Sequence, residues 1–299
     1  MQIYHQPVML KETVEALILK PDGIYVDITF GGGGHSRKIL EMLSSKGKLL
    51  AFDQDADALQ NLPDDERFTF IPANFRYLKR FLRLHGVTQV DGIIGDFGVS
   101  SYQIDTPERG FSTRFNAPLD MRMDASKGIS ANEVLNTYDF DRLVLMFKLF
   151  GEIHQAKALA RRIEQFRQEK PLMTTGELVD LARPLAGPKD AKFLSQVFQA
   201  IRIEVNEELE VIKELLIQSG EVLNEGGRLV LMSYHSLEDR LVKNYFKAAN
   251  FSGEPDKDLY GNYTLIFKQI HKKAIEATPE EIDMNPRARS AKLRIGEKL

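Results

Sequence analysis

The chain has 299 residues, 43% of them hydrophobic and 28% charged, which is typical of a globular domain large enough to carry a second, smaller one. Its 40 basic and 43 acidic residues give a net charge of −3, so any nucleic-acid contact must come from local patches. The absence of cysteine excludes disulfides and thiolate zinc sites and suits a cytoplasmic protein, and the sequence predicts no metal site, signal peptide or membrane span.

Strands and helices alternate along the first hundred residues. Short apolar runs predict four strands, at residues 24–29, 48–52, 67–71 and 90–95. Helical spacing predicts the helices between them, at residues 35–45, 55–62 and 76–85. Strands that are separated by helices of this length form a parallel sheet with right-handed crossovers.

This alternation stops after residue 105. A loop rich in Arg, Asp and Pro (residues 106–128) leads into a continuous helical pattern, in which Ser130-x-x-Glu133 and Thr174-x-x-Glu177 have the spacing of helix-capping boxes. We therefore predict an all-helical domain at residues 106–208, which would recognise the substrate, inserted into an α/β domain formed by residues 1–105 and 209–299. Strand character returns at residues 227–233, before a helix at 236–248 and two further strands at 263–270 and 291–295.

Four consecutive glycines follow the first predicted strand and precede a helix. Glycine permits positive φ and close approach of a ligand to backbone N–H groups, and the N-terminus of a helix favours negative charge. The dinucleotide pattern G-x-G-x-x-G fails because Ser36 stands where the third glycine belongs. An acidic residue, three spacers and G-x-G (Asp27, Gly31, Gly33) instead look like the first motif of Rossmann-like methyltransferases.

Two further carboxylates end predicted strands. Asp53 can accept both hydroxyls of an adenosine ribose, as in NAD enzymes and methyltransferases alike. Asp96 can hold the N–H of an amine that receives a methyl group, or bind the amino group of the cofactor, and the sequence does not separate the two. After the strand at 227–233, Tyr234 can stack on a base and His235 can relay a proton, or His235 is an ordinary surface histidine.

Basic residues gather near the C-terminus. Arg287, Arg289, Lys292 and Arg294 have no acid between them, and arginines spaced by two in an extended segment would face phosphates together. The loop at residues 108–112 mixes charged and apolar residues, which favours either an RNA contact through Arg109 or a buried hinge.

The chain resembles the MraW family of ribosomal RNA small-subunit methyltransferases along nearly its whole length. The resemblance is carried by His5–Val8, Thr29–Ser36, Asp96–Ser101, Glu108–Ser112, Pro118–Met123, Phe198–Ile203, His235–Arg240 and Asn285–Ser290. It implies a Rossmann-like class I methyltransferase fold. It also implies methylation of the N4 amine of a decoding-centre cytidine in 16S rRNA of the small subunit, with S-adenosylmethionine as donor and a homodimer as one form of the protein.

The resemblance also assigns site residues. It implies cofactor contacts at Gly33, Gly34, His35, Asp53, Phe75, Asp96 and Gln103, of which Phe75 and Gln103 follow from the family alone. Asp96 and His235 are then the candidate catalytic residues, and Arg109, Tyr234, Arg287 and Arg289 the candidate RNA contacts. Two positions depart from the family: Gly32 replaces an arginine, and Tyr102 replaces a proline before Gln103.

Other functions stay open on the residues alone. A DNA cytosine-N4 methyltransferase would need the same pocket, whereas a small-molecule methyltransferase would not need the arginine-rich tail. A non-catalytic RNA-binding module with a retained nucleoside pocket would bind the cofactor without turnover.

Overall fold

The computed structural model describes residues 7–299, apart from the side chain of Lys189, so His5 of the first motif lies outside the described residues. The chain forms two compact units. One comprises the chain up to Gly98 and from Leu209 onward, and the other comprises Val99–Glu208. The second unit begins before residue 106, because a short helix, α4 (Ser101–Asp105), belongs to it.

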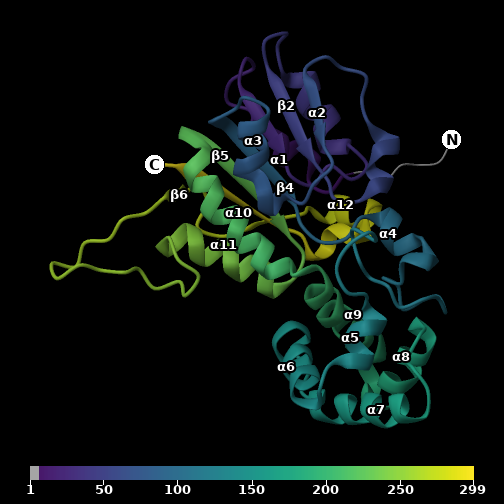
Figure 1. Cartoon of the computed structure of the whole chain (residues 1–299). Coiled ribbons are helices and arrows are strands. Elements are labelled where there is room, and N and C mark those ends of the chain that lie inside the picture. The colour runs from purple at the N-terminus through teal and green to yellow at the C-terminus, as the bar shows by residue number, and fades with distance from the viewer. Residues whose placement is uncertain (1–6) are drawn as a thin grey trace. The chain divides into compact units, whose positions relative to one another are not determined.

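The first unit is built on one sheet with the strand order β3-β2-β1-β4-β5-β8-β6, while β7 also pairs with β8 (Figure 1). The strands are β1 (Ile24–Asp27), β2 (Lys48–Phe52), β3 (Phe68–Ile71), β4 (Val90–Asp96), β5 (Leu223–Ser233), β6 (Phe267–Gln269), β7 (Ile275–Glu276) and β8 (Lys292–Lys298). The first five strands are parallel, and β8 runs antiparallel to β5, β6 and β7.

This order places the switch point of the sheet at β1 and β4. Strand order reverses there, and open α/β sheets bind ligands beyond the carboxyl ends of the strands at such a point. Asp27, the last residue of β1, lies in register with Ala51 of β2 and with Ile94 of β4. The segments that follow these three strands therefore leave the sheet at one edge.

Helices cover both faces of the sheet. Successive strand residues point to opposite faces, so Tyr25 packs in one apolar cluster with α1 and α2, and Val26 packs in another with α3, α10 and α11. The helices of this unit are α1 (Leu10–Leu17), α2 (Gly34–Met42), α3 (Leu78–Leu84), α10 (Glu208–Val222), α11 (Ser236–Ala248) and α12 (Pro279–Met284).

The strands predicted in the first hundred residues are confirmed, whereas several other elements differ from the prediction. Residues 56–61 form a 3-10 helix, η1 (Ala56–Asn61), rather than an α-helix, because Pro63 disfavours a helical conformation at Leu62. The predicted strand at 263–270 is reduced to β6, since only residues 267–269 pair with β8. The sequence did not predict α1, α4, α10, α12 or β7.

The second unit is helical. It contains α4, α5 (Ala131–Thr137), α6 (Phe140–Gly151), α7 (Ala156–Glu169), α8 (Thr175–Ala182) and α9 (Asp190–Asn206), around a core of its own. Both predicted capping boxes are confirmed: the Glu133 carboxylate accepts the backbone N–H of Ser130, and that of Glu177 accepts the N–H of Thr174. None of the helices among residues 7–299 is long and apolar enough to cross a bilayer.

An ion pair ties α11 to the sheet. The Arg294 guanidinium on β8 donates to both oxygens of Asp239 on α11, at 2.6 and 3.1 Å, and both side chains are nearly buried. Two parallel N–H···O bonds fix the geometry of such a pair. The pair therefore sets how α11 lies along β8.

We expect Arg294→Met to lower the free energy of unfolding by about 3 kcal/mol, because it leaves the Asp239 carboxylate buried without its cation. Lys268→Met, on the neighbouring strand β6, is the matched control: its 4.0 Å pair with Glu297 is exposed, and its loss should cost less than about 1 kcal/mol. Urea denaturation of both variants measures the difference, and equal losses would contradict the structural role of the pair.

Candidate active site

The glycine turn between β1 and α2 is tight and left-handed. Gly31 and Gly33 have φ of 49° and 73°, and the N–H of Gly33 donates to the carbonyl of Phe30 at 2.7 Å. A Cβ on Gly33 would lie 2.8 Å from the Phe30 ring, whereas a Cβ on Gly31 would meet nothing nearer than the Thr29 carbonyl at 4.0 Å. The turn is therefore packed beneath Gly33 and open at Gly31.

Asp27 holds the start of this turn. Its carboxylate is buried and accepts the hydroxyl of Ser36 at 2.7 Å and the backbone N–H of Thr29 at 3.0 Å. Burial raises its pKa above the ordinary range. The Thr29 hydroxyl in turn accepts the backbone N–H of Asp96 at 2.7 Å. Asp27 thus shapes the loop from inside and links the end of β1 to that of β4.

Asp53 holds the same turn from β2. One carboxylate oxygen accepts the backbone N–H of Gly31 at 2.7 Å, and the other accepts that of Asp55 at 2.9 Å. A carboxylate has about four acceptor positions, so Asp53 can still accept hydroxyl groups from a ligand. Burial raises its pKa to about 6, although both N–H groups favour the ionised form.

Asp96 lies at the end of β4 and contacts the segment after β5. Its Oδ1 accepts the hydroxyl of Tyr234 at 2.7 Å. Burial raises the pKa of Asp96 to about 7; the Tyr234 hydroxyl lowers it and the Glu238 carboxylate raises it. A carboxyl that changes charge near neutral pH at a strand end is a candidate functional group.

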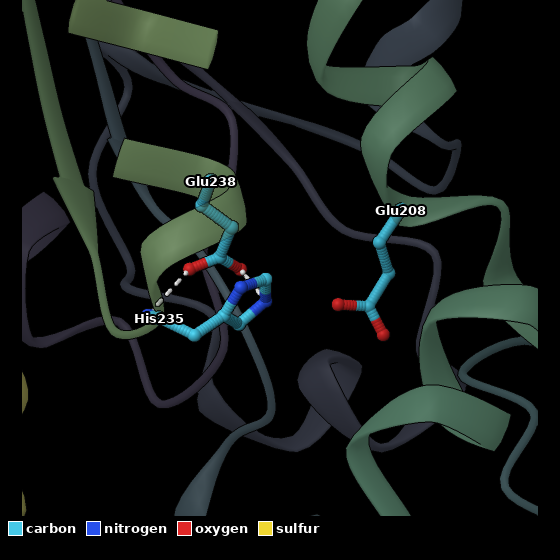
Figure 2. A group of neighbouring side chains, drawn as sticks. All are labelled: Glu208, His235 and Glu238. Carbon is cyan, nitrogen blue, oxygen red and sulfur yellow. Dashed lines mark hydrogen bonds and ion pairs between the residues drawn. The ribbon is translucent and has the colours of Figure 1, made fainter. Parts of the chain in front are cut away.

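Glu238 orders the residues that follow β5. Its side chain is fully buried, and its Oε2 accepts the backbone N–H groups of Tyr234 and His235 at 2.9 and 3.3 Å. The imidazole Nε2 of His235 lies 3.1 Å from Oε1 of the same carboxylate (Figure 2). Glu238 was missed as a site residue, although the spacing from His235 to Glu238 is that of a helix-capping box at the start of α11.

His35 and Gly34 pack against the segment before α1. The imidazole of His35 is buried, and its Nε2 lies 3.2 Å from the carbonyl oxygen of Val8. Burial lowers the pKa of His35, so the neutral ring donates its N–H to that carbonyl. A Cβ on Gly34 would lie 2.1 Å from Pro7, so only glycine fits there.

Phe75 begins a 3-10 turn, η2 (Phe75–Tyr77), that follows β3. Its half-buried ring lies 6.2 Å from that of Phe97, the residue after Asp96, and the two rings are tilted by 30°. The pair forms an aromatic wall beside the carboxyl ends of the strands. The structure thus brings the glycine turn, Asp53, Phe75, Asp96 and Tyr234 to one edge of the sheet.

Gln103 and Arg109 belong to the second unit. The amide oxygen of the buried Gln103 side chain accepts the backbone N–H of Ser100 at 3.0 Å, and the backbone N–H of Gln103 donates to the Ser100 hydroxyl at 3.1 Å, so the two residues cap α4. Arg109 is half-buried and donates to the carbonyls of Arg122 and Met123 at 3.1 and 3.0 Å. These bonds give both residues a structural role within their unit.

The prediction of an extended basic tail is wrong for Arg287 and Arg289, whereas Lys292 and Arg294 lie in the strand β8. Residues 286–290 form a 3-10 helix, η6 (Pro286–Ser290), which begins at a proline, and the Asn285 side chain accepts the N–H of Arg287. Arg289 is exposed and Arg287 is half-buried, so the two do not share one face. Arg294 is paired with Asp239, which removes it from the candidate phosphate contacts.

Residues 2–299 match the MraW methylase family. The chain belongs to this family. It is 56% identical over 297 residues to Ribosomal RNA small subunit methyltransferase H of Christiangramia forsetii, which covers 99% of this chain and 98% of that protein. It is 55% identical over 299 residues to the protein of the same name from Cytophaga hutchinsonii, and this match covers 99% of this chain and 100% of that protein.

Among solved structures, an rRNA methylase from Streptococcus thermophilus aligns with a TM-score of 0.41 and 14% identity over 97% of this chain and 93% of that one. The family assignment therefore rests on the sequence match, which spans both units. The fold of this MraW methylase is the expected Rossmann-like class I methyltransferase fold.

The pKa of Asp96 makes the stability of this methylase depend on pH. The folded protein holds a proton on Asp96 between the ordinary carboxyl pKa and about 7, whereas the unfolded chain does not, so the free energy of unfolding falls as pH rises through that range. Between pH 5 and pH 8 the free energy of unfolding should therefore fall by about 2 kcal/mol less in Asp96→Asn than in the wild-type chain. Urea denaturation at both values measures it.

The control for this prediction is Asp64→Asn, which alters an exposed carboxylate between β2 and β3. It should leave the pH dependence of the wild-type chain unchanged. An Asp96→Asn protein that loses as much stability as the wild type between pH 5 and pH 8 would show that Asp96 is ionised throughout.

Proposed function

We propose that the chain transfers a methyl group from S-adenosylmethionine to the exocyclic N4 amine of a decoding-centre cytidine in 16S rRNA. The observation that carries the proposal is that the glycine turn, Asp53 and Asp96 meet at the carboxyl edge of β1, β2 and β4. Membership of a methylase family and relatives named as small-subunit rRNA methyltransferases support the reaction class.

The residues of this edge fit an adenosyl group. Gly31 leaves open space beside the backbone of the turn, and the free acceptor positions of Asp53 suit ribose hydroxyls. The ring of Phe75, beside that of Phe97, can stack on adenine. Gly33, Gly34 and His35 then supply backbone at the start of α2, and Gln103 supplies a further contact. When bound, the donor supplies a methyl group on a sulfonium cation.

Asp96 would act on the amine. A cation beside a carboxyl lowers its pKa, so Asp96, which titrates at about 7, becomes ionised in the loaded site and accepts an amine N–H. This contact orients the amine lone pair, and orientation is a large part of catalysis in a displacement of this kind. The Tyr234 hydroxyl fixes the position of Asp96, and its ring can stack on the cytosine. His235, which lies beside the Glu238 carboxylate, would take up the proton that the amine loses after methyl transfer.

The substrate would be the small ribosomal subunit rather than a small molecule. Arg289 is exposed and lies three residues before Lys292, which pairs with the last residue of β5, so it can contact a phosphate near the carboxyl edge, together with Arg287 and, from the helical unit, Arg109. The helical unit would contribute to recognition of the subunit. The proposal includes a cytoplasmic location, where ribosomes are substrates, and a homodimer as one form of the protein.

Transfer of a labelled methyl group tests the function. We expect the purified chain to label unmethylated small subunits on one cytosine, at N4, and to leave duplex DNA and free cytidine unlabelled. Nucleoside analysis of the product identifies the atom. Labelling of duplex DNA but not of subunits would establish the DNA alternative, and donor binding without transfer to any acceptor would establish the non-catalytic one.

We expect Asp53→Ala to weaken donor binding by about tenfold or more, because charge-assisted bonds to Gly31 and to the ligand are lost together. Asp64→Ala removes an exposed carboxylate and should leave donor binding unchanged.

A second variant tests the RNA contact. We expect Arg289→Ala to weaken binding to small subunits, because it removes an exposed cation, and to leave donor affinity near normal. Calorimetry with the donor and filter binding with subunits measure the two affinities, and equal effects of Asp53→Ala and Arg289→Ala on both would contradict this division.

A further inference from the structure

A basic groove lies on the first unit beside β8, two strands away from β4, which carries Asp96. Its volume is about 430 Å³. It is lined by charged side chains from α11, from the segment around β7 and from β8: Lys243, Lys272, Lys273, Glu276, Lys292 and Arg294. We call this the lysine groove.

The positive charge of the lysine groove is not neutralised within the part of the chain that the structure describes. Arg294 is paired with Asp239, but none of the four lysines makes an ion pair with any residue in the range 7–299. Glu276 is the single acid among the lining residues. In a chain with a net charge of −3, four unpaired lysines around one groove form a local field that attracts an anion.

The register of the sheet places this groove beside the candidate active site. Asp96 of β4 pairs with Met232 of β5, and Met232 pairs with Leu293 of β8. Lys292, the next residue, lies opposite Ser233, which precedes Tyr234. Two strand spacings of about 4.8 Å separate the backbone of Asp96 from that of β8, which is about 10 Å in all. Lys292 is one residue out of register with Asp96, so the two side chains lie on opposite faces of the sheet, and a strand of nucleic acid that reaches both must pass around the carboxyl edge.

We propose that the lysine groove holds the phosphate backbone of the rRNA strand next to the methylated cytidine. This inference rests on the proposed function and adds a substrate-binding surface to it. Lysine is a flexible point charge that suits phosphates without reading sequence, as positioning of a substrate strand requires. The contacts would hold the strand in register while Asp96 and Tyr234 receive the base.

The test compares two triple variants with equal loss of charge. Lys243→Gln, Lys272→Gln and Lys273→Gln alter the groove. Lys11→Gln, Lys46→Gln and Lys48→Gln alter exposed lysines elsewhere on the same unit, none of which has an ion pair among the described residues. Binding to unmethylated small subunits is measured across a series of salt concentrations, with methyl-transfer kinetics and donor calorimetry alongside.

We expect the groove variant to reduce the slope of log affinity against log salt by about 2, because each lost contact with a single strand removes about 0.7. Its KM for subunits should rise at least tenfold, while kcat and donor affinity stay near wild type. The control variant should match the wild type in all four quantities. Unchanged donor affinity also shows that the groove variant is folded.

The two proposals fail in different ways. If the wild-type chain methylates subunits and the groove variant has the same KM and salt slope as the control variant, the lysine groove does not hold RNA and the proposed function stands. If the wild-type chain transfers no methyl group to subunits, the proposed function is overturned. A lower kcat with unchanged KM would also overturn the groove proposal, since a phosphate contact acts on binding. The single variant Lys292→Gln, nearest to Tyr234, should reproduce part of the rise in KM.

Discussion

The turn between β1 and α2 keeps its shape because two carboxylates, at the ends of the neighbouring strands β1 and β2, bind it. Asp27 holds the N–H of Thr29 and the hydroxyl of Ser36, and Asp53 holds the N–H of Gly31. A run of four glycines has many accessible conformations and loses much entropy when it is ordered. Hydrogen bonds to charged acceptors offset that cost and leave the open side of the turn available to a ligand.

The same arrangement places three buried carboxylates at one edge of the sheet, where their ionised forms are unfavourable. Asp27, Asp53 and Asp96 are held where burial raises the pKa of each, so their ionised forms reduce the stability of the protein near neutral pH. Groups with such shifts gather where proteins bind and react with ligands. A cation next to Asp96 would reverse part of this cost, so donor binding and carboxylate ionisation would favour each other.

Positive charge is used in two ways along β8. Arg294 forms a nearly buried pair with Asp239 and fixes α11, whereas Lys292 stays unpaired among the described residues and faces the lysine groove. Side chains two residues apart on a strand point to the same face of the sheet, so the difference between Arg294 and Lys292 does not come from the direction of their side chains. It comes from the partner: the arginine forms two fixed bonds with the Asp239 carboxylate, whereas Glu276, which lies opposite Lys292 in the sheet, makes no ion pair with any of the four lysines.

The sequence by itself determined the five parallel strands, the glycine turn, and Asp53 and Asp96 at strand ends, because these depend on residue periodicity and on the rule that parallel strands end at one edge. It also determined the family through motifs along the whole chain. Only the tertiary structure decided the partners of each side chain. The conformation of residues 286–290, the pairing of Arg294 and the role of Glu238 all depend on contacts between segments far apart in the chain, or on local turns that override an apparent pattern. Local patterns do not carry that information, since the same basic or acidic residue is exposed or buried according to what packs against it.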